Sequence, residues 1–162
     1  MKVTRFLVVS AVLVALAATP VFAQAWTDQD VIVNISANMP ELTQLRFVQG
    51  NTELDLVEPQ AVLIGTMHER SNNPGGYIVS LTSLRSGALA GPDGETAAYE
   101  LSYDGSVIDL SSGSATLTTA GGRTPAAGVS REIVVTPQVD GEADFLAAGA
   151  YTDTLTFTIS GQ

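Results

Sequence analysis

The stretch Gly149-Ala-Tyr-Thr-Asp-Thr-Leu-Thr-Phe-Thr-Ile-Ser-Gly-Gln162 gives the clearest indication of the fold. Within it, Leu155, Phe157 and Ile159 alternate with threonine and serine at every second position. Such alternation is typical of a β-strand that buries one face and exposes the other. The strand must pair with a neighbour, because unpaired backbone groups and an exposed apolar row are both costly. The identity of that neighbour is therefore the functional question.

Similar short segments recur through the chain at intervals of about ten residues. Alternating or continuous apolar residues predict strands at 30–37, 42–48, 61–67, 77–82, 99–103, 107–110, 115–119 and 133–135. The Asn-Asn-Pro-Gly-Gly stretch at 72–76 predicts a hairpin connection, and Asp104-Gly105 predicts a two-residue hairpin turn. No segment after residue 23 predicts a helix. The sequence therefore predicts an all-β protein, an antiparallel β-sandwich.

Residues 1–23 are interpreted as a secretory signal peptide. A basic start and an apolar run at 6–18 precede the small-residue cleavage site Val21-Phe22-Ala23, and a second site ends at Ala25. The apolar run is shorter than the roughly 20 residues that a membrane-spanning helix needs. We therefore expect export, through the periplasm to the cell surface or the medium, and a single β-sandwich domain at 24–162.

Charge and cysteine content exclude several classes of function. Removal of the signal peptide takes two of the seven basic residues and none of the seventeen acidic ones, so the formal net charge changes from −10 to −12. No lysine remains, and the arginines are scattered singly, which disfavours binding to nucleic acid or to anionic membranes. The chain has no cysteine, so neither a disulfide nor a thiol nucleophile is available. Stability must come from a packed core.

No catalytic or metal-binding pattern stands out. His68 is the single histidine, and the sequence places no nucleophile elbow or metal-ligand spacing beside it. We interpret it as a titratable residue at the end of a strand. The acidic segments 92–95 and 140–144 lack the spaced oxygen ligands of a calcium loop and are interpreted as turns. The sequence predicts a protein that is not an enzyme and holds no metal or cofactor.

Two segments resemble parts of bacterial fimbrial subunits. Ser71-Asn-Asn-Pro-Gly-Gly-Tyr-Ile-Val-Ser-Leu-Thr-Ser83 is similar to the SNN-x-GY segment of those proteins, and Ala148-Gly-Ala-Tyr-Thr-Asp-Thr-Leu-Thr-Phe-Thr-Ile159 is similar to their closing strand. The resemblance is closest to spore-coat-protein-U-like and archaic chaperone-usher pilins. The chain departs from many pilins in lacking a disulfide near the first strand and in having Gly161 where an aromatic residue is common next to last.

The resemblance implies an incomplete immunoglobulin-like sandwich that a periplasmic chaperone holds, an usher assembles, and the N-terminal strand of a neighbouring subunit completes. The protein would then be a structural subunit of a surface fimbria, or pilus, used in cell adhesion. The residues that would contact the chaperone and form the acceptor groove are Tyr151, Leu155, Phe157 and Ile159. Those of the donor strand, within residues 24–39, are Val31, Val33 and Ile35.

Two other readings stay open at this point. The leader at 24–30 is short, so the first predicted strand could belong to its own domain, which would then be a self-contained secreted module. Such a module would bind a carbohydrate or a surface partner through the loops at 86–94 and 120–128. A secreted hydrolase acting through His68 is the least favoured reading.

Overall fold

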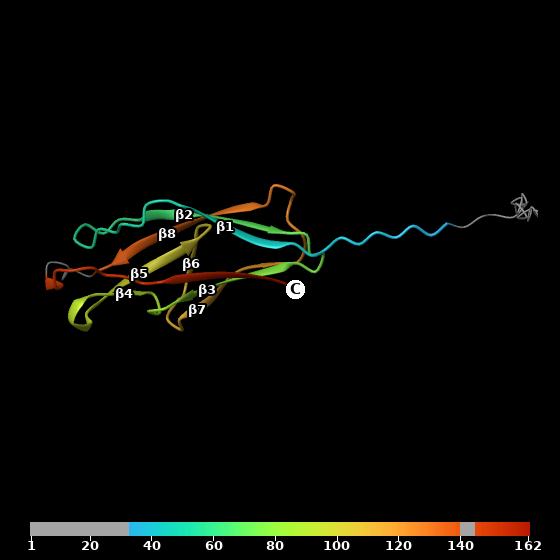
Figure 1. The fold of residues 1–162 in the computed structure, drawn as a ribbon. Coiled ribbons are helices and arrows are strands. Elements are labelled where there is room, and N and C mark those ends of the chain that lie inside the picture. Colours follow the sequence, from blue (N-terminus) through green and yellow to red (C-terminus); the bar gives the residue numbers. More distant parts are fainter. Residues whose placement is uncertain (1–32, 140–144) are drawn as a thin grey trace, which may run out of the picture. The chain divides into compact units, whose positions relative to one another are not determined.

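Two antiparallel β-sheets pack face to face in the computed structural model, which describes residues 33–139 and 145–162 (Figure 1). The first sheet has the strand order β1 (Thr43–Gln49), β2 (Val62–Ser71), β8 (Val129–Gln138), β5 (Thr96–Tyr103) and β4 (Ala88–Ala90), with β6 (Ser106–Ile108) paired to β5. The second has the order β7 (Ser114–Ala120), β3 (Tyr77–Ser83) and β9 (Leu155–Gly161). The predicted all-β sandwich is confirmed. The predicted signal peptide, Val31 and the acidic segment 140–144 lie outside the described residues.

The strand order is that of an immunoglobulin-like sandwich. In the constant-type arrangement, strands A, B, E and D form one sheet and strands C, F and G form the other. β1, β2, β8 and β5 take the places of A, B, E and D, and β3 and β9 take those of C and F. β9 pairs with β3, and no strand among the described residues lies along its other side, where G stands in the seven-stranded arrangement. One edge of β9 therefore has no strand partner in the described part of the chain.

The turn predictions have different outcomes. β5 and β6 form the predicted hairpin, and Asp104 and Gly105 both have the positive φ angles, 50° and 78°, that a two-residue turn of this kind requires. The predicted hairpin at 72–76 is wrong, because β2 and β3 belong to different sheets. Both strands bury one face on the same core, so the connection crosses from one layer to the other and leaves each strand to pair elsewhere.

One loop prediction also changes. The segment predicted as a loop at 86–94 contains β4 and a short 3₁₀ turn, η1 (Pro92–Gly94). Leu54, in the loop between β1 and β2, packs against the core. In the part of the chain that the structure describes, no helix has the length and apolarity needed to cross a membrane.

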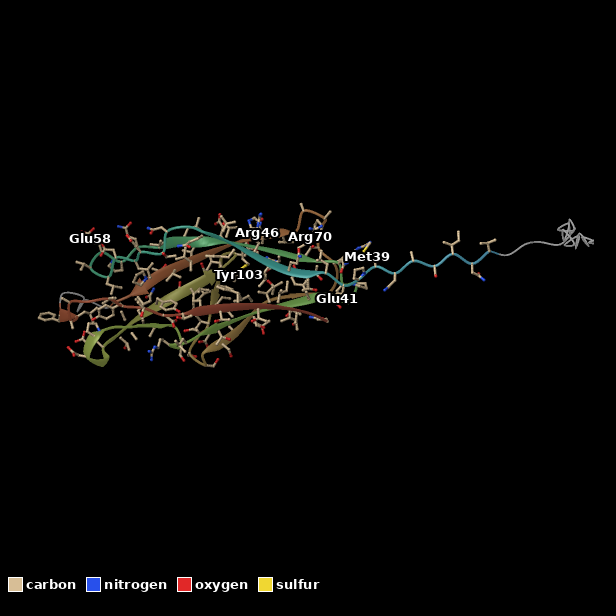
Figure 2. All side chains as sticks on the ribbon, in the orientation of Figure 1. Met39, Glu41, Arg46, Glu58, Arg70 and Tyr103 are labelled. Carbon is tan, nitrogen blue, oxygen red and sulfur yellow. The ribbon has the colours of Figure 1, made fainter. Side chains whose placement is uncertain are left out.

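A carboxylate lies in the core between the two sheets. Glu69 of β2 is 0 % exposed. Its two oxygens accept hydrogen bonds from the hydroxyl groups of Tyr77 (2.8 Å), Tyr103 (2.5 Å) and Thr118 (2.9 Å), and from Nε of Arg131 (3.1 Å). Figure 2 shows Tyr103 between the two layers. These four donors come from β3, β5, β7 and β8, so Glu69 joins five strands of both sheets. We call these five residues the Glu69 cluster.

The raised pKa values of three buried tyrosines predict how the free energy of unfolding changes at alkaline pH. Burial, followed by the bond to Glu69, raises the pKa of Tyr77 to about 12 and also raises that of Tyr103. Burial and the bond to Asp153 raise the pKa of Tyr99. The unfolded chain gives up these protons near pH 10. The stabilisation is therefore complete below pH 10 and is lost as pH rises above it, by at most about 1.4 kcal/mol per pH unit and tyrosine.

Absorbance titration of phenolate measures this effect. We expect the native chain to show almost no phenolate at pH 10, whereas the urea-unfolded chain is about half ionised there. Thermal midpoints should fall between pH 10 and pH 11.5. A native titration with its midpoint at pH 10 would contradict the prediction.

Candidate functional site

An apolar groove of about 530 Å³ lies between β1 and β9, the edge strands of the two sheets. Leu45 and Phe47 of β1 form one wall, and Leu155 and Phe157 of β9 form the other. The floor consists of the buried core residues Met67, Tyr99 and Val135 and the partly buried Ile64. The lining also includes Thr52, Leu54 and Leu89, which lie in loops or an edge strand. The groove thus opens the hydrophobic core along the unpaired edge of β9.

Two stacked rings lie across this groove. The ring centroids of Phe47 and Phe157 are 6.5 Å apart, with an angle of 15° between the ring planes. The ring of Phe47 also lies over Gly65, where a Cβ atom would come within 2.4 Å of it. Phe47 is nevertheless 43 % exposed, and Leu155 and Phe157 are only half-buried although they face the interior. The inner row of β9 is therefore incompletely covered.

Asn72 holds the chain where it enters β1, beside one end of the groove. Its Oδ1 accepts a hydrogen bond from the backbone N–H of Leu42 (2.7 Å), and its Nδ2 donates to the carbonyl of Pro40 (2.9 Å). Its own backbone N–H donates to the carbonyl of Leu42 (3.0 Å). The asparagine therefore extends the β1–β2 ladder by one pair and fixes the place where the N-terminal segment leaves the domain.

Asn73 joins this point to the end of β9. Its Nδ2 donates to Oε1 of Glu41 (3.2 Å) and to the carbonyl of Gln162 (3.0 Å). Gly161 packs so closely that a Cβ there would lie 2.0 Å from Oε1 of Glu41. Figure 2 shows Met39 and Glu41 where the chain enters β1. The first residues of the domain and its last residues are thus tied together at one end of the groove.

Asp153 closes the other end. Its Oδ2 accepts hydrogen bonds from the hydroxyl groups of Ser83 and Tyr99, both at 2.6 Å, and its Oδ1 accepts from the backbone N–H of Arg85 (3.0 Å) and of Thr154 (2.7 Å). The carboxylate lines the groove and ties the start of β9 to β3 and β5. The apolar groove is therefore bounded at both ends by polar side chains, Asn73 and Asp153, that already form hydrogen bonds within the domain.

Tyr151 stabilises the corner that leads into β9. Its ring lies against Gly91, and its hydroxyl is 2.8 Å from Oε2 of Glu95 and 3.1 Å from the carbonyl of Ala147. A tyrosine that bonds back to the chain just before strand F is a feature of immunoglobulin-like domains. Bonds from the Ala147 N–H and from Tyr151 lower the pKa of Glu95, while burial and Glu95 raise that of Tyr151.

The structure brings together part of the predicted acceptor set. Leu155 and Phe157 line the groove, whereas Ile159 pairs with Val79 beyond it and Tyr151 lies at the corner. Sequence reasoning did not find Leu45, Phe47, Leu54 or Asp153 as parts of the site. Leu45 and Phe47 fall in a strand predicted from their apolar character, but no local signal says that the strand is an edge facing β9.

The predicted donor segment is described only in part. Residues 33–40 form no strand, so the expected strand at 30–37 is absent from its described part. Val33 and Ile35 are 73 % and 91 % exposed. A strand needs a partner for its backbone groups, and no strand of the described chain pairs with these residues. Their apolar side chains remain in contact with water.

His68 has a neighbour that its sequence context does not reveal. Its Nδ1 is 2.8 Å from Oγ of Ser130, which lies opposite it on β8. No hydrogen-bond partner orients the ring through its other nitrogen in the described chain. The pair therefore lacks the third member of a nucleophilic triad. Among the described residues, no three histidine, aspartate or glutamate side chains converge on a point that could hold a metal ion.

No protein-family model matches the chain, and no curated protein matches it. The fold and the groove are therefore the basis for the function proposed below.

Proposed function

We propose that the protein is a structural subunit of a bacterial surface fimbria, assembled by strand donation. The observation that carries the proposal is the open edge of β9 above a groove that reaches the core. A strand laid along this edge would complete the backbone ladder and cover the groove with its apolar side chains. An extended segment with apolar residues at every second position would both pair with the backbone of β9 and cover the groove.

The N-terminal segment has this pattern. Val31, Val33 and Ile35 alternate with polar residues, and the two of them that the structure describes are exposed. Burial of each such side chain contributes about 1.5–3 kcal/mol, and the strand would add backbone hydrogen bonds to β9. The segment and the groove therefore suit each other chemically.

Chain geometry favours donation between molecules. Every strand pair of the described chain is antiparallel, as G is to F in the immunoglobulin arrangement. An antiparallel donor ends near Leu155, but a molecule's own segment is fixed at Pro40 beside Gly161, six strand steps or about 20 Å away. The five residue steps from Ile35 to Pro40 span at most about 18 Å when fully extended. This is less than the distance to be covered, and the chain would also have to reverse direction. The donor must therefore come from a second molecule.

The same groove explains the expected helpers. An open apolar edge favours aggregation during export. A periplasmic chaperone would cover the groove until an usher brings the next subunit, and the exported fibre would remain on the cell surface. Assembly therefore needs no catalytic residue in this chain.

Deletion of residues 24–37 tests the proposal. We expect the truncated chain to remain monomeric or chaperone-bound in size-exclusion chromatography, while the full mature chain forms polymers. Normal assembly of the truncated chain would refute strand donation. A full mature chain that is a stable monomer without any chaperone would instead favour the self-contained binding module.

Engineered cysteine pairs test the direction of the donor, because the native chain has no cysteine to interfere. With Val33 beside Phe157, an antiparallel donor places Ile35→Cys beside Leu155→Cys and Val31→Cys beside Ile159→Cys. We expect ladders of cross-linked chains from these pairs in denaturing gels. The exchanged pair Ile35→Cys with Ile159→Cys is the matched control, and a preference for it within single chains would indicate parallel self-insertion.

A further inference from the structure

Away from the groove, the outer face of β1 and β2 carries two arginines beside the single histidine. Arg46 lies opposite His68 in the β1–β2 ladder, and Gln44 lies opposite Arg70. Figure 2 shows Arg46 and Arg70 directed away from the second sheet. Residues 24–162 contain five arginines and one histidine, so three of these six side chains gather on four neighbouring positions. This concentration is unusual in a chain with seventeen acidic residues.

Among the described residues, no carboxylate forms an ion pair with Arg46 or Arg70. Both ion pairs among the described residues belong to Arg131. Glu132, the nearest acidic residue of this face along β8, lies opposite Thr66 rather than opposite a cation. Like charges on neighbouring strand positions repel each other. A bound anion would remove this repulsion.

These residues surround a hollow of about 560 Å³. The loop between β7 and β8 contributes Ala126 and Ala127 as one wall, and Figure 1 shows this loop rising above the sheet. Thr124 fixes the loop, because its N–H donates to the carbonyl of Ser71 (2.9 Å) and its Oγ1 accepts from the Ser71 N–H (3.1 Å). Leu45 and Glu69 also line it, but the Glu69 carboxylate is buried in the core with its own hydrogen-bond donors. We call the space bounded by Gln44, Arg46, His68, Arg70 and the two alanines the basic hollow.

We propose that the basic hollow binds an acidic saccharide through the carboxylate of a uronic acid unit. Guanidinium groups match carboxylates in planar, two-bonded geometry. The amide of Gln44 in the lining is a neutral group suited to sugar hydroxyls, and so is the hydroxyl of Ser130, which contacts His68 from the neighbouring strand β8. The volume lies within the range of small-ligand sites, and the alanine wall leaves room for a ring. This binding is independent of strand donation, because it uses the outer face of the sheet.

Isothermal titration of the mature chain with trigalacturonate tests the proposal. We expect binding that weakens as salt is added and that falls at least about tenfold in the Arg46→Gln/Arg70→Gln variant, since hydrogen bonds between charged groups are the strong ones. Arg85→Gln is the matched control, because it removes an exposed arginine elsewhere, and should bind as the unaltered chain does. Circular dichroism would show that both variants fold.

Three further probes test whether the basic hollow is selective for an acidic saccharide. Neutral maltotriose should not bind, and inorganic sulfate should bind far more weakly than trigalacturonate. Equal affinity for sulfate would overturn the proposal, since the hollow would then recognise charge alone. Tighter binding of a peptide with the chain's own sequence Pro137-Gln-Val-Asp-Gly-Glu-Ala-Asp-Phe145 would overturn it in favour of a contact between copies. Equal loss of binding in Arg85→Gln would also overturn it.

Discussion

Replacement of Phe157 by aspartate is expected to abolish assembly of the mature chain. Phe157 faces the groove beside the open edge of β9, where a donor strand would cover it. An aspartate there stays hydrated in the isolated subunit, because the position is only half-buried, but would lose its water when a donor strand docks. The cost of burying an unpaired charge is several kcal/mol, which corresponds to a loss of at least about a hundredfold in affinity.

Thr158→Asp is the matched control for this prediction. Thr158 is the next residue of the same strand, but it is exposed on the outer face of the sheet. We expect its aspartate variant to assemble normally in sedimentation and electron microscopy. Equal assembly of the two variants would mean that the groove does not receive a strand, and equal failure would point to a general effect of charge on β9.

Replacement of Glu69 by alanine is expected to lower the free energy of unfolding by about 3–5 kcal/mol. The change leaves the guanidinium of Arg131 and three hydroxyl groups without their shared acceptor in the core. In the unaltered protein, every buried side-chain nitrogen or oxygen among the described residues has a hydrogen-bond partner. Urea unfolding of the mature chain measures the loss. Glu69→Gln keeps the shape and one acceptor, so its loss should be smaller.

Glu100→Ala is the control, because Glu100 is exposed on β5 of the same sheet and makes no such bonds. Its free energy of unfolding should change by less than about 0.5 kcal/mol. A similar small change for Glu69→Ala would show that the Glu69 cluster contributes little to stability. The prediction for Phe157 concerns assembly and this one concerns the fold of the subunit, so the two can fail separately.

Local patterns account for the strands that were predicted correctly. β9, β2 and the β5–β6 hairpin each have a period-two or continuous apolar pattern, and Asp104-Gly105 specifies its own turn. The hairpin prediction at 72–76 was wrong because turn-forming residues indicate a change of chain direction but not which sheet the next strand joins. Asn72 and Asn73 are part of that turn signal, yet their amide groups bond to residues about 30 and 90 positions away.

Local patterns were enough to predict that this chain is all-β, that its last strand has one apolar face, and that a second alternating segment lies at 30–37. These properties depend on the order of apolar and polar side chains over a few residues, which can be read from the sequence. The three-dimensional arrangement was needed to show that β9 lies at an edge, that Leu45 and Phe47 face it across a groove, and that Arg46 lies opposite His68. The physical reason is that strand neighbours are chosen by long-range pairing and by the packing of two layers, which join residues far apart in the sequence.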